Sequence, residues 1–119
     1  MTAPALPQHL DPNANLPTTY LVSRHPGALQ WLRARLGPAG QHAVVLTHLP
    51  EDFLAPPGSK VLGVLPLAWL ERLQAQGAQP WVLDVSLPPE LRGQELSAAQ
   101  LDALGARLVR YGVRRLGER

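Results

Sequence analysis

Residues 19–28, TYLVSRHPGA, predict a β-strand that passes directly into an α-helix. The first five residues, Thr19 to Ser23, are mostly β-branched or aromatic, which favours a strand. Pro26 suits the first turn of a helix, where its missing N–H would have no partner in any case. The helix then continues with an apolar face at helical spacing, formed by Leu29, Leu32 and Leu36. A strand followed at once by a helix is typical of α/β domains.

The rest of the chain alternates in the same way. Further strands are predicted over 42–48, 60–65 and 81–86, and further helices over 66–77 and 97–111. Ser97 and Gln100 form a capping-box pattern at the start of the last helix. We therefore expect one α/β domain over residues 18–117, with the order β-α-β-β-α-β-α and a mostly parallel sheet of about four strands flanked by helices. The link 49–58 is barely long enough for a parallel crossover, so an antiparallel third strand stays open.

Composition excludes several classes of protein. The 119 residues are 45% hydrophobic, which suits one globular domain. The absence of cysteine excludes disulfides, a thiolate nucleophile and a cysteine metal site. No apolar run approaches the ~20 residues of a membrane helix, and residues 1–17, with four prolines, predict a flexible tail rather than a secretory signal. We therefore expect a cytoplasmic protein with no membrane contact.

Charge is nearly balanced, with a formal net charge of +2. This value does not suggest a protein that coats long nucleic acids. Five arginines nevertheless fall between Arg107 and Arg119. They could complement the dipole at the end of the predicted last helix, or they could meet an anionic partner.

Polar side chains follow three of the four predicted strands. Ligands of open α/β sheets bind outside the carboxyl ends of the strands, so these side chains are the candidates for a site. They are Ser23, Arg24 and His25 after the first strand, His48, Glu51 and Asp52 after the second, and Ser86 with the loop carrying Glu90, Arg92 and Glu95 after the fourth.

Ser23, Arg24 and His25 form the strongest candidate. They combine a hydroxyl, a permanent cation and an imidazole, a side chain that can both accept and donate a proton. All three precede a predicted helix N-terminus, whose free amides bind anions such as phosphate. The alternative is simple helix capping by Ser23, with Arg24 and His25 exposed to solvent.

A metal site is the weaker hypothesis. His42 and His48 can share one face of the second strand, and Glu51 and Asp52 follow closely. Their spacing matches no common metal motif, so we predict no metal. There is also no Gly-x-Gly-x-x-Gly fingerprint, and we expect no cofactor. Asp84 lies within an apolar strand and needs a polar network or a dimer partner. The three tryptophans, Trp31, Trp69 and Trp81, are expected in the core or an interface.

Three stretches together resemble one known family. They are TYLVSRHPGA at 19–28 with Trp31, VLGVLP at 61–66, and LPPELRGQELS at 87–97. These segments are similar to the CRISPR-associated Csx family number sixteen, small accessory proteins of type III CRISPR loci. The resemblance covers nearly all of residues 18–111.

The resemblance implies a Rossmann-like fold related to the CRISPR ligand-sensing (CARF) domains. It also implies a homodimeric ring nuclease that cleaves cyclic oligoadenylates, chiefly cyclic tetra-adenylate, and so ends antiviral signalling. The ribose 2′-hydroxyl would attack the neighbouring phosphate without a metal, leaving a 2′,3′-cyclic phosphate. We assign catalysis to His25 and Arg24, and substrate binding to Ser23, Arg24, Arg92 and Ser86. Two alternatives remain: a module that binds the ring without cutting it, and a protein–protein adaptor that uses the basic C-terminal helix.

Overall fold

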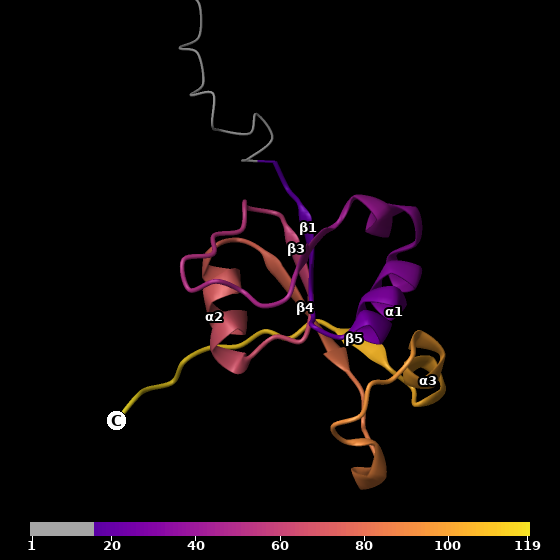
Figure 1. The fold of residues 1–119 in the computed structure, drawn as a ribbon. Helices are drawn as coiled ribbons and strands as arrows, with labels where there is room; N and C mark the ends of the chain where they lie inside the picture. Colours follow the sequence, from indigo (N-terminus) through magenta and orange to yellow (C-terminus); the bar gives the residue numbers. More distant parts are fainter. Residues whose placement is uncertain (1–15) are drawn as a thin grey trace, which may run out of the picture.

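The computed structural model describes residues 16–119 and contains five strands and three α-helices in that range (Figure 1). The tail predicted over residues 1–17 falls almost wholly outside the described part, so its flexibility stays a prediction. The strands are β1 (Thr19–Val22), β2 (Val44–Leu46), β3 (Lys60–Gly63), β4 (Gln79–Asp84) and β5 (Arg107–Val109). The helices are α1 (Pro26–Leu36), α2 (Leu67–Ala75) and α3 (Ala98–Ala103), with short 3₁₀ turns η1 (Gly37–His42) and η2 (Pro89–Leu91).

The strands form one sheet in the order β2-β1-β3-β4-β5. β1 pairs in parallel with both β2 and β3, and β3 pairs in parallel with β4. The predicted α/β class and mostly parallel sheet are therefore confirmed, and the antiparallel alternative for the third strand is wrong. The short link 49–58 suffices because it carries the chain from the edge strand β2, past β1, without forming a helix.

The end of the chain differs from the prediction. The capping box at Ser97 and Gln100 is present, but α3 ends at Ala103 instead of continuing to Tyr111. Gly105, at φ 81°, then turns the chain into β5, which pairs antiparallel with β4. Leu104, Ala106 and Leu108 fit a period of two as well as a helical face, and the open edge of β4 offers backbone partners. The sheet consequently has five strands rather than four.

The same difference removes the helix-end explanation for the five C-terminal arginines. Arg107 lies on β5 opposite Asp84, and its guanidinium pairs with that carboxylate at 3.2 Å. Asp84 thus has the polar partner that its position in an apolar strand requires. Arg115 pairs with Glu71 on α2 at 2.8 Å. An adaptor built on a basic C-terminal helix loses its structural basis, because residues 110–119 contain no helix.

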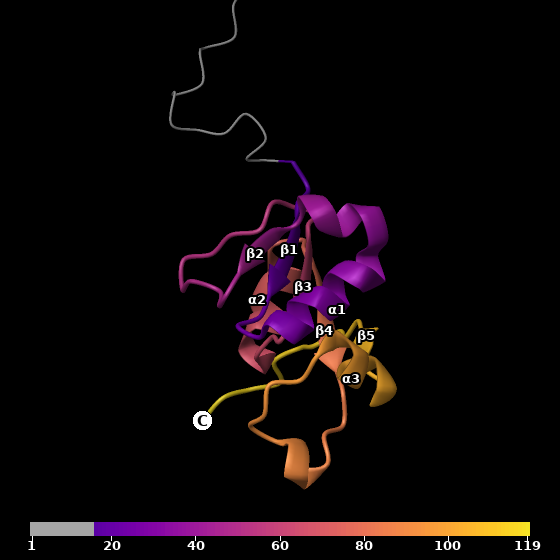
Figure 2. The same ribbon diagram turned by 45° about the vertical axis from the view of Figure 1, so that its right-hand side comes forward.

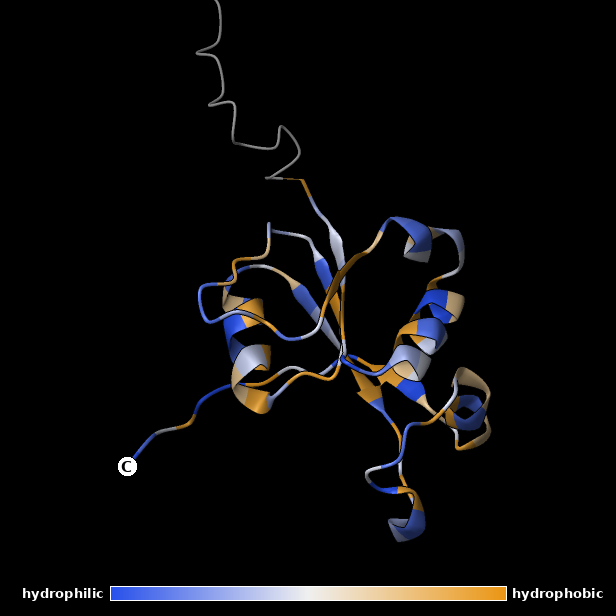
Figure 3. Ribbon diagram, viewed as in Figure 1, coloured by the Kyte–Doolittle hydropathy of each residue, from blue (hydrophilic) through white to orange (hydrophobic). Residues whose placement is uncertain are grey.

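Two layers of helices cover the sheet, with α1 and α3 on one face and α2 on the other (Figures 1 and 2). Each face has its own apolar cluster. Leu21, Trp31 and Leu32 belong to the α1 side, and Val61, Trp69 and Leu73 to the α2 side. Trp31 and Trp69 are buried, as expected for core residues. Figure 3 shows apolar residues along the strands, while the helices carry both apolar and polar residues.

Gln76, which directly follows α2, binds two backbone groups of the link after β2. The Gln76 side chain accepts a hydrogen bond from the Ala55 N–H at 2.8 Å and donates one to the Phe53 carbonyl at 3.2 Å. One amide side chain thereby satisfies backbone groups of a link that contains no strand or helix. None of the helices in residues 16–119 combines the length and apolar character needed to cross a membrane.

Candidate functional site

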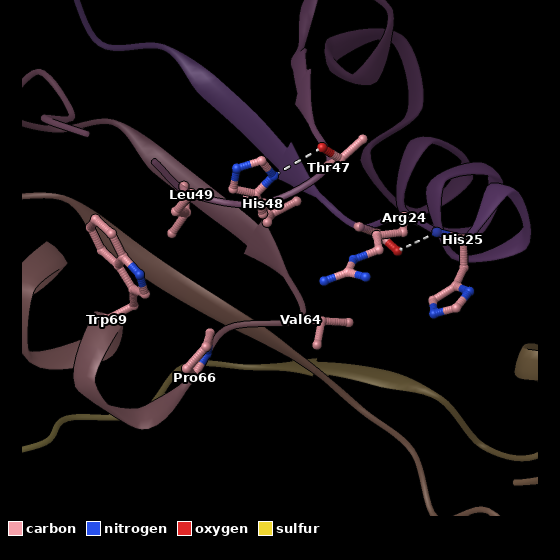
Figure 4. Close-up of a pocket in the computed structure, with 10 residues that line it drawn as sticks. Arg24, His25, Thr47, His48, Leu49, Val64, Pro66 and Trp69 are labelled. Carbon is pink, nitrogen blue, oxygen red and sulfur yellow. Dashed lines mark hydrogen bonds between the residues drawn. The ribbon is translucent and has the colours of Figure 1, made fainter. Parts of the chain in front are cut away.

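A pocket of about 280 Å³ opens at the carboxyl ends of β1, β2 and β3 (Figure 4). One side of it is polar and the other is apolar. The polar side comes from the ends of β1 and β2, and consists of Ser23, Arg24, His25, Thr47 and His48; the apolar side consists of Val22, Leu49, Val64, Pro66 and Trp69. The pocket therefore offers a cation and two imidazoles at one side and an apolar surface at the other.

The topology explains why a pocket forms here. α1 connects β1 to β2 on one face of the sheet, whereas α2 connects β3 to β4 on the opposite face. The chain thus leaves the neighbouring strands β1 and β3 in opposite directions. Such a switch point leaves a crevice at the carboxyl edge, where doubly wound sheets bind their ligands.

Ser23 shapes the turn between β1 and α1. It is buried, with 3% of its surface exposed. Its N–H donates to the Leu46 carbonyl at 3.0 Å, extending the pairing with β2, and its Oγ accepts from the His25 N–H at 3.0 Å. This hydroxyl–backbone bond is a local turn motif. Ser23 does not cap the helix, because the N-cap residue of α1 is His25 and no side chain makes a capping hydrogen bond there. The capping alternative for Ser23 is therefore wrong, and its hydroxyl instead fixes the turn from which Arg24 and His25 project.

Arg24 and His25 project in different directions. Figure 4 shows the Arg24 guanidinium in the space between His48 and Val64, while the His25 ring turns away from that space. Among the described residues no carboxylate pairs with Arg24, whereas His25 Nδ1 lies 2.7 Å from Glu95 Oε1. Arg24 is thus free to meet an anion in the pocket, and His25 stands at its rim.

His48 joins Arg24 and His25 in the pocket. Its Nδ1 lies 3.2 Å from Thr47 Oγ1, and its other ring nitrogen has no hydrogen-bond partner among residues 16–119 (Figure 4). The sequence places His48 among the candidate residues after the second strand, where it is weighed with His42, Glu51 and Asp52 as a metal ligand and not as a partner of Arg24. Glu51 instead pairs with Arg72 at 3.3 Å. The described residues contain no group of three possible metal ligands.

Ser86 and Arg92, the other predicted binding residues, do not line this pocket. Both are exposed on the segment between β4 and α3. This segment extends away from the carboxyl edge before it returns to α3 (Figure 2). Glu95 is the residue of this segment whose side chain reaches the pocket rim, through His25. The sequence placed Glu95 in the right loop but contained no signal of that contact.

Comparison with known proteins identifies one family. Residues 20–114 match the model of the family described as "Putative CRISPR-associated protein (Cas_VVA1548)". The matched range includes all the strands except the first residue of β1, all three helices and every residue of the pocket. No curated protein and no solved structure matches the chain.

Proposed function

We propose, on the premise that this chain belongs to the CRISPR-associated family Cas_VVA1548, that it is a ring nuclease for cyclic oligoadenylates. The family itself supports a CRISPR association, and the ring nuclease activity is what the resemblance of the sequence to the Csx family number sixteen implies. The observation that carries the proposal is the pocket at the β1/β3 switch point, which Arg24 and His48 line and at whose rim His25 stands. Cyclic tetra-adenylate is the expected substrate.

The two sides of the pocket suit the two parts of a nucleotide. Arg24 provides a guanidinium that pairs with no carboxylate of residues 16–119 and can meet a phosphate, and the N-terminus of α1 adds a favourable dipole beside it. Leu49, Pro66 and Trp69 offer an apolar surface for an adenine ring. A ligand that is anionic at one end and flat and apolar at the other fits this arrangement.

The proposed reaction needs groups that position the ribose and move protons. The ribose 2′-oxygen attacks the adjacent phosphorus as the bond to the 5′-oxygen breaks. One imidazole, His25, takes the 2′-proton, and the second, His48, protonates the leaving 5′-oxygen. Arg24 stabilises the charge that develops on the phosphoryl oxygens. The products carry a 2′,3′-cyclic phosphate and a 5′-hydroxyl, and since the nucleophile is part of the substrate, no activated water is required.

We expect the chain to act as a homodimer. Its pocket of about 280 Å³ is slightly smaller than the ~300–1,000 Å³ typical of sites for drug-sized ligands, and a ring of four nucleotides is larger than such ligands. A second copy related by a two-fold axis would supply the same groups to the other half of the ring. Light scattering at micromolar concentration, with and without cyclic tetra-adenylate, should give the mass of a dimer. A monomer under both conditions contradicts this expectation.

A single-turnover assay with radiolabelled cyclic tetra-adenylate tests the activity. In the presence of EDTA we expect linear products that end in a 2′,3′-cyclic phosphate. Recovery of the intact ring bound to the protein would contradict the enzyme and identify a non-catalytic binding module instead. A protein that neither binds nor cleaves the ring would contradict both functions.

A further inference from the structure

The contact between His25 and Glu95 joins two segments that lie 70 residues apart in the sequence. His25 is the N-cap residue of α1, and Glu95 belongs to the segment that leads into α3. The distance of 2.7 Å between Nδ1 and Oε1 is short for a nitrogen–oxygen hydrogen bond, as expected when the acceptor is a carboxylate. Because a carboxylate only accepts, Nδ1 must carry the proton in this contact.

The backbone position of Glu95 is set by the packing of the two residues that follow it, Leu96 and Ser97. The next residue, Leu96, is buried in the apolar cluster on the α1 side. Its carbonyl lies so close to α1 that a Cβ placed on Gly27 would come within 1.8 Å of the carbonyl oxygen. Ser97 then begins α3 with its capping box. The backbone on the C-terminal side of Glu95 is therefore fixed against the first turn of α1, directly beside His25.

The position of His25 is fixed as well. The Ser23 hydroxyl accepts from its backbone N–H, and Pro26 follows it as the first residue of α1. Both partners of the His25–Glu95 contact are thus attached to well-packed backbone, although their side chains are more than half exposed. An exposed ion pair adds little to stability, so a contact of this kind has its main consequence in the orientation and protonation of the imidazole.

We propose that Glu95 is a positioning residue for His25. It holds the proton on Nδ1 and leaves the Nε2 lone pair available as a base. The catalytic consequence rests on the proposed function: His25 Nε2 takes the ribose 2′-proton while the O2′–P bond forms and the P–O5′ bond breaks, and His48 donates a proton to the departing 5′-oxygen. The Glu95 carboxylate then faces the imidazolium that has formed and stabilises its charge.

The first test follows the imidazole itself and requires no activity. The full chain, labelled with nitrogen-15 in its histidines, is examined by NMR at a pH at which free imidazole is neutral. The His25 signals are assigned with the His25→Ala variant. In the wild-type protein we expect Nδ1 to be the protonated nitrogen, and in Glu95→Ala we expect the proton to move predominantly to Nε2. Glu90→Ala, a change in the same segment, is the matched control and should leave the wild-type tautomer.

The second test measures single-turnover cleavage of cyclic tetra-adenylate by the same variants. Glu95→Ala should lower the rate about tenfold, a part of the ~10²–10⁴-fold that general acid–base catalysis contributes, with little change in ring binding. Glu95→Gln keeps an acceptor and should restore much of the rate, while Glu90→Ala should match wild type. An unchanged His25 tautomer in Glu95→Ala, or an unchanged cleavage rate, overturns the proposal. If the wild-type protein cleaves no ring, the proposed function fails instead, and the NMR result alone decides whether Glu95 orients His25.

Discussion

Replacing His25 by alanine is expected to lower the single-turnover rate of ring cleavage by about 10²–10⁴-fold, the usual contribution of a general acid or base. The dissociation constant of the ring should change far less. The reason is that the imidazole transfers a proton only in the transition state, whereas binding depends mainly on phosphate and base contacts. Rates and dissociation constants measured on the same preparations separate the two effects.

Arg24→Ala is the comparison that shows whether the effect of His25→Ala is confined to proton transfer. A guanidinium contacts phosphate in the ground state and in the transition state alike, so this variant should lose affinity as well as rate. A hydrogen bond to a charged group contributes about 1.5–3 kcal/mol, which corresponds to roughly 10–100-fold in binding. Arg33→Ala, which removes an exposed arginine from the last turn of α1, is the matched control and should behave like wild type.

Arg92→Ala examines the one predicted binding arginine that lies outside the pocket. With the segment in its present position, the variant should bind the ring nearly as well as wild type. A loss comparable to that of Arg24→Ala would mean that the segment between β4 and α3 closes over the ligand. If His25→Ala and Arg24→Ala both retain wild-type rates and affinities, the assignment of the site to this pocket is wrong.

Gly63→Ala is expected to give the largest loss of stability. Gly63 ends β3 with φ at 141°, a conformation that side chains rarely adopt, and an added Cβ would lie 2.1 Å from the Val22 carbonyl oxygen on β1. Backbone strain costs about 1–3 kcal/mol, and overpacking against a buried strand costs a similar amount. We therefore expect the free energy of unfolding to fall by about 2–6 kcal/mol, the sum of the two costs, measured by denaturant unfolding followed by circular dichroism.

Gly93→Ala separates the two causes of that loss. Gly93 also has a positive φ, 81°, but nothing lies within 4 Å of an added Cβ. In Gly93→Ala the free energy of unfolding should fall only by the backbone strain of a side chain at positive φ, about 1–2 kcal/mol. Equal losses in the two variants would show that close approach of β1 and β3 at Gly63 contributes nothing. A larger loss at Gly63 also predicts damage to the pocket, since Val22 directly precedes Ser23.

Much of the fold follows from local patterns in the chain. The strand–helix unit from Thr19 to Leu36, the central strands and α2 were predicted because hydrophobic periodicity and Pro and Gly positions are local signals. The capping box at Ser97 was found for the same reason. The carboxyl-edge rule then identified Ser23, Arg24 and His25, which do line the pocket.

The tertiary structure decided what depends on pairing between distant segments. Residues 107–109 became β5 because β4 presented an open edge, although the same leucines also suited a helix. His48 joined Arg24 because β2 lies beside β1, and Glu95 met His25 because the close approach of Gly27 and Leu96 places the two segments together. Local patterns specify the faces that a segment must bury, but they do not specify its neighbour. The neighbour is selected by the packing of the whole chain, and with it the composition of the site.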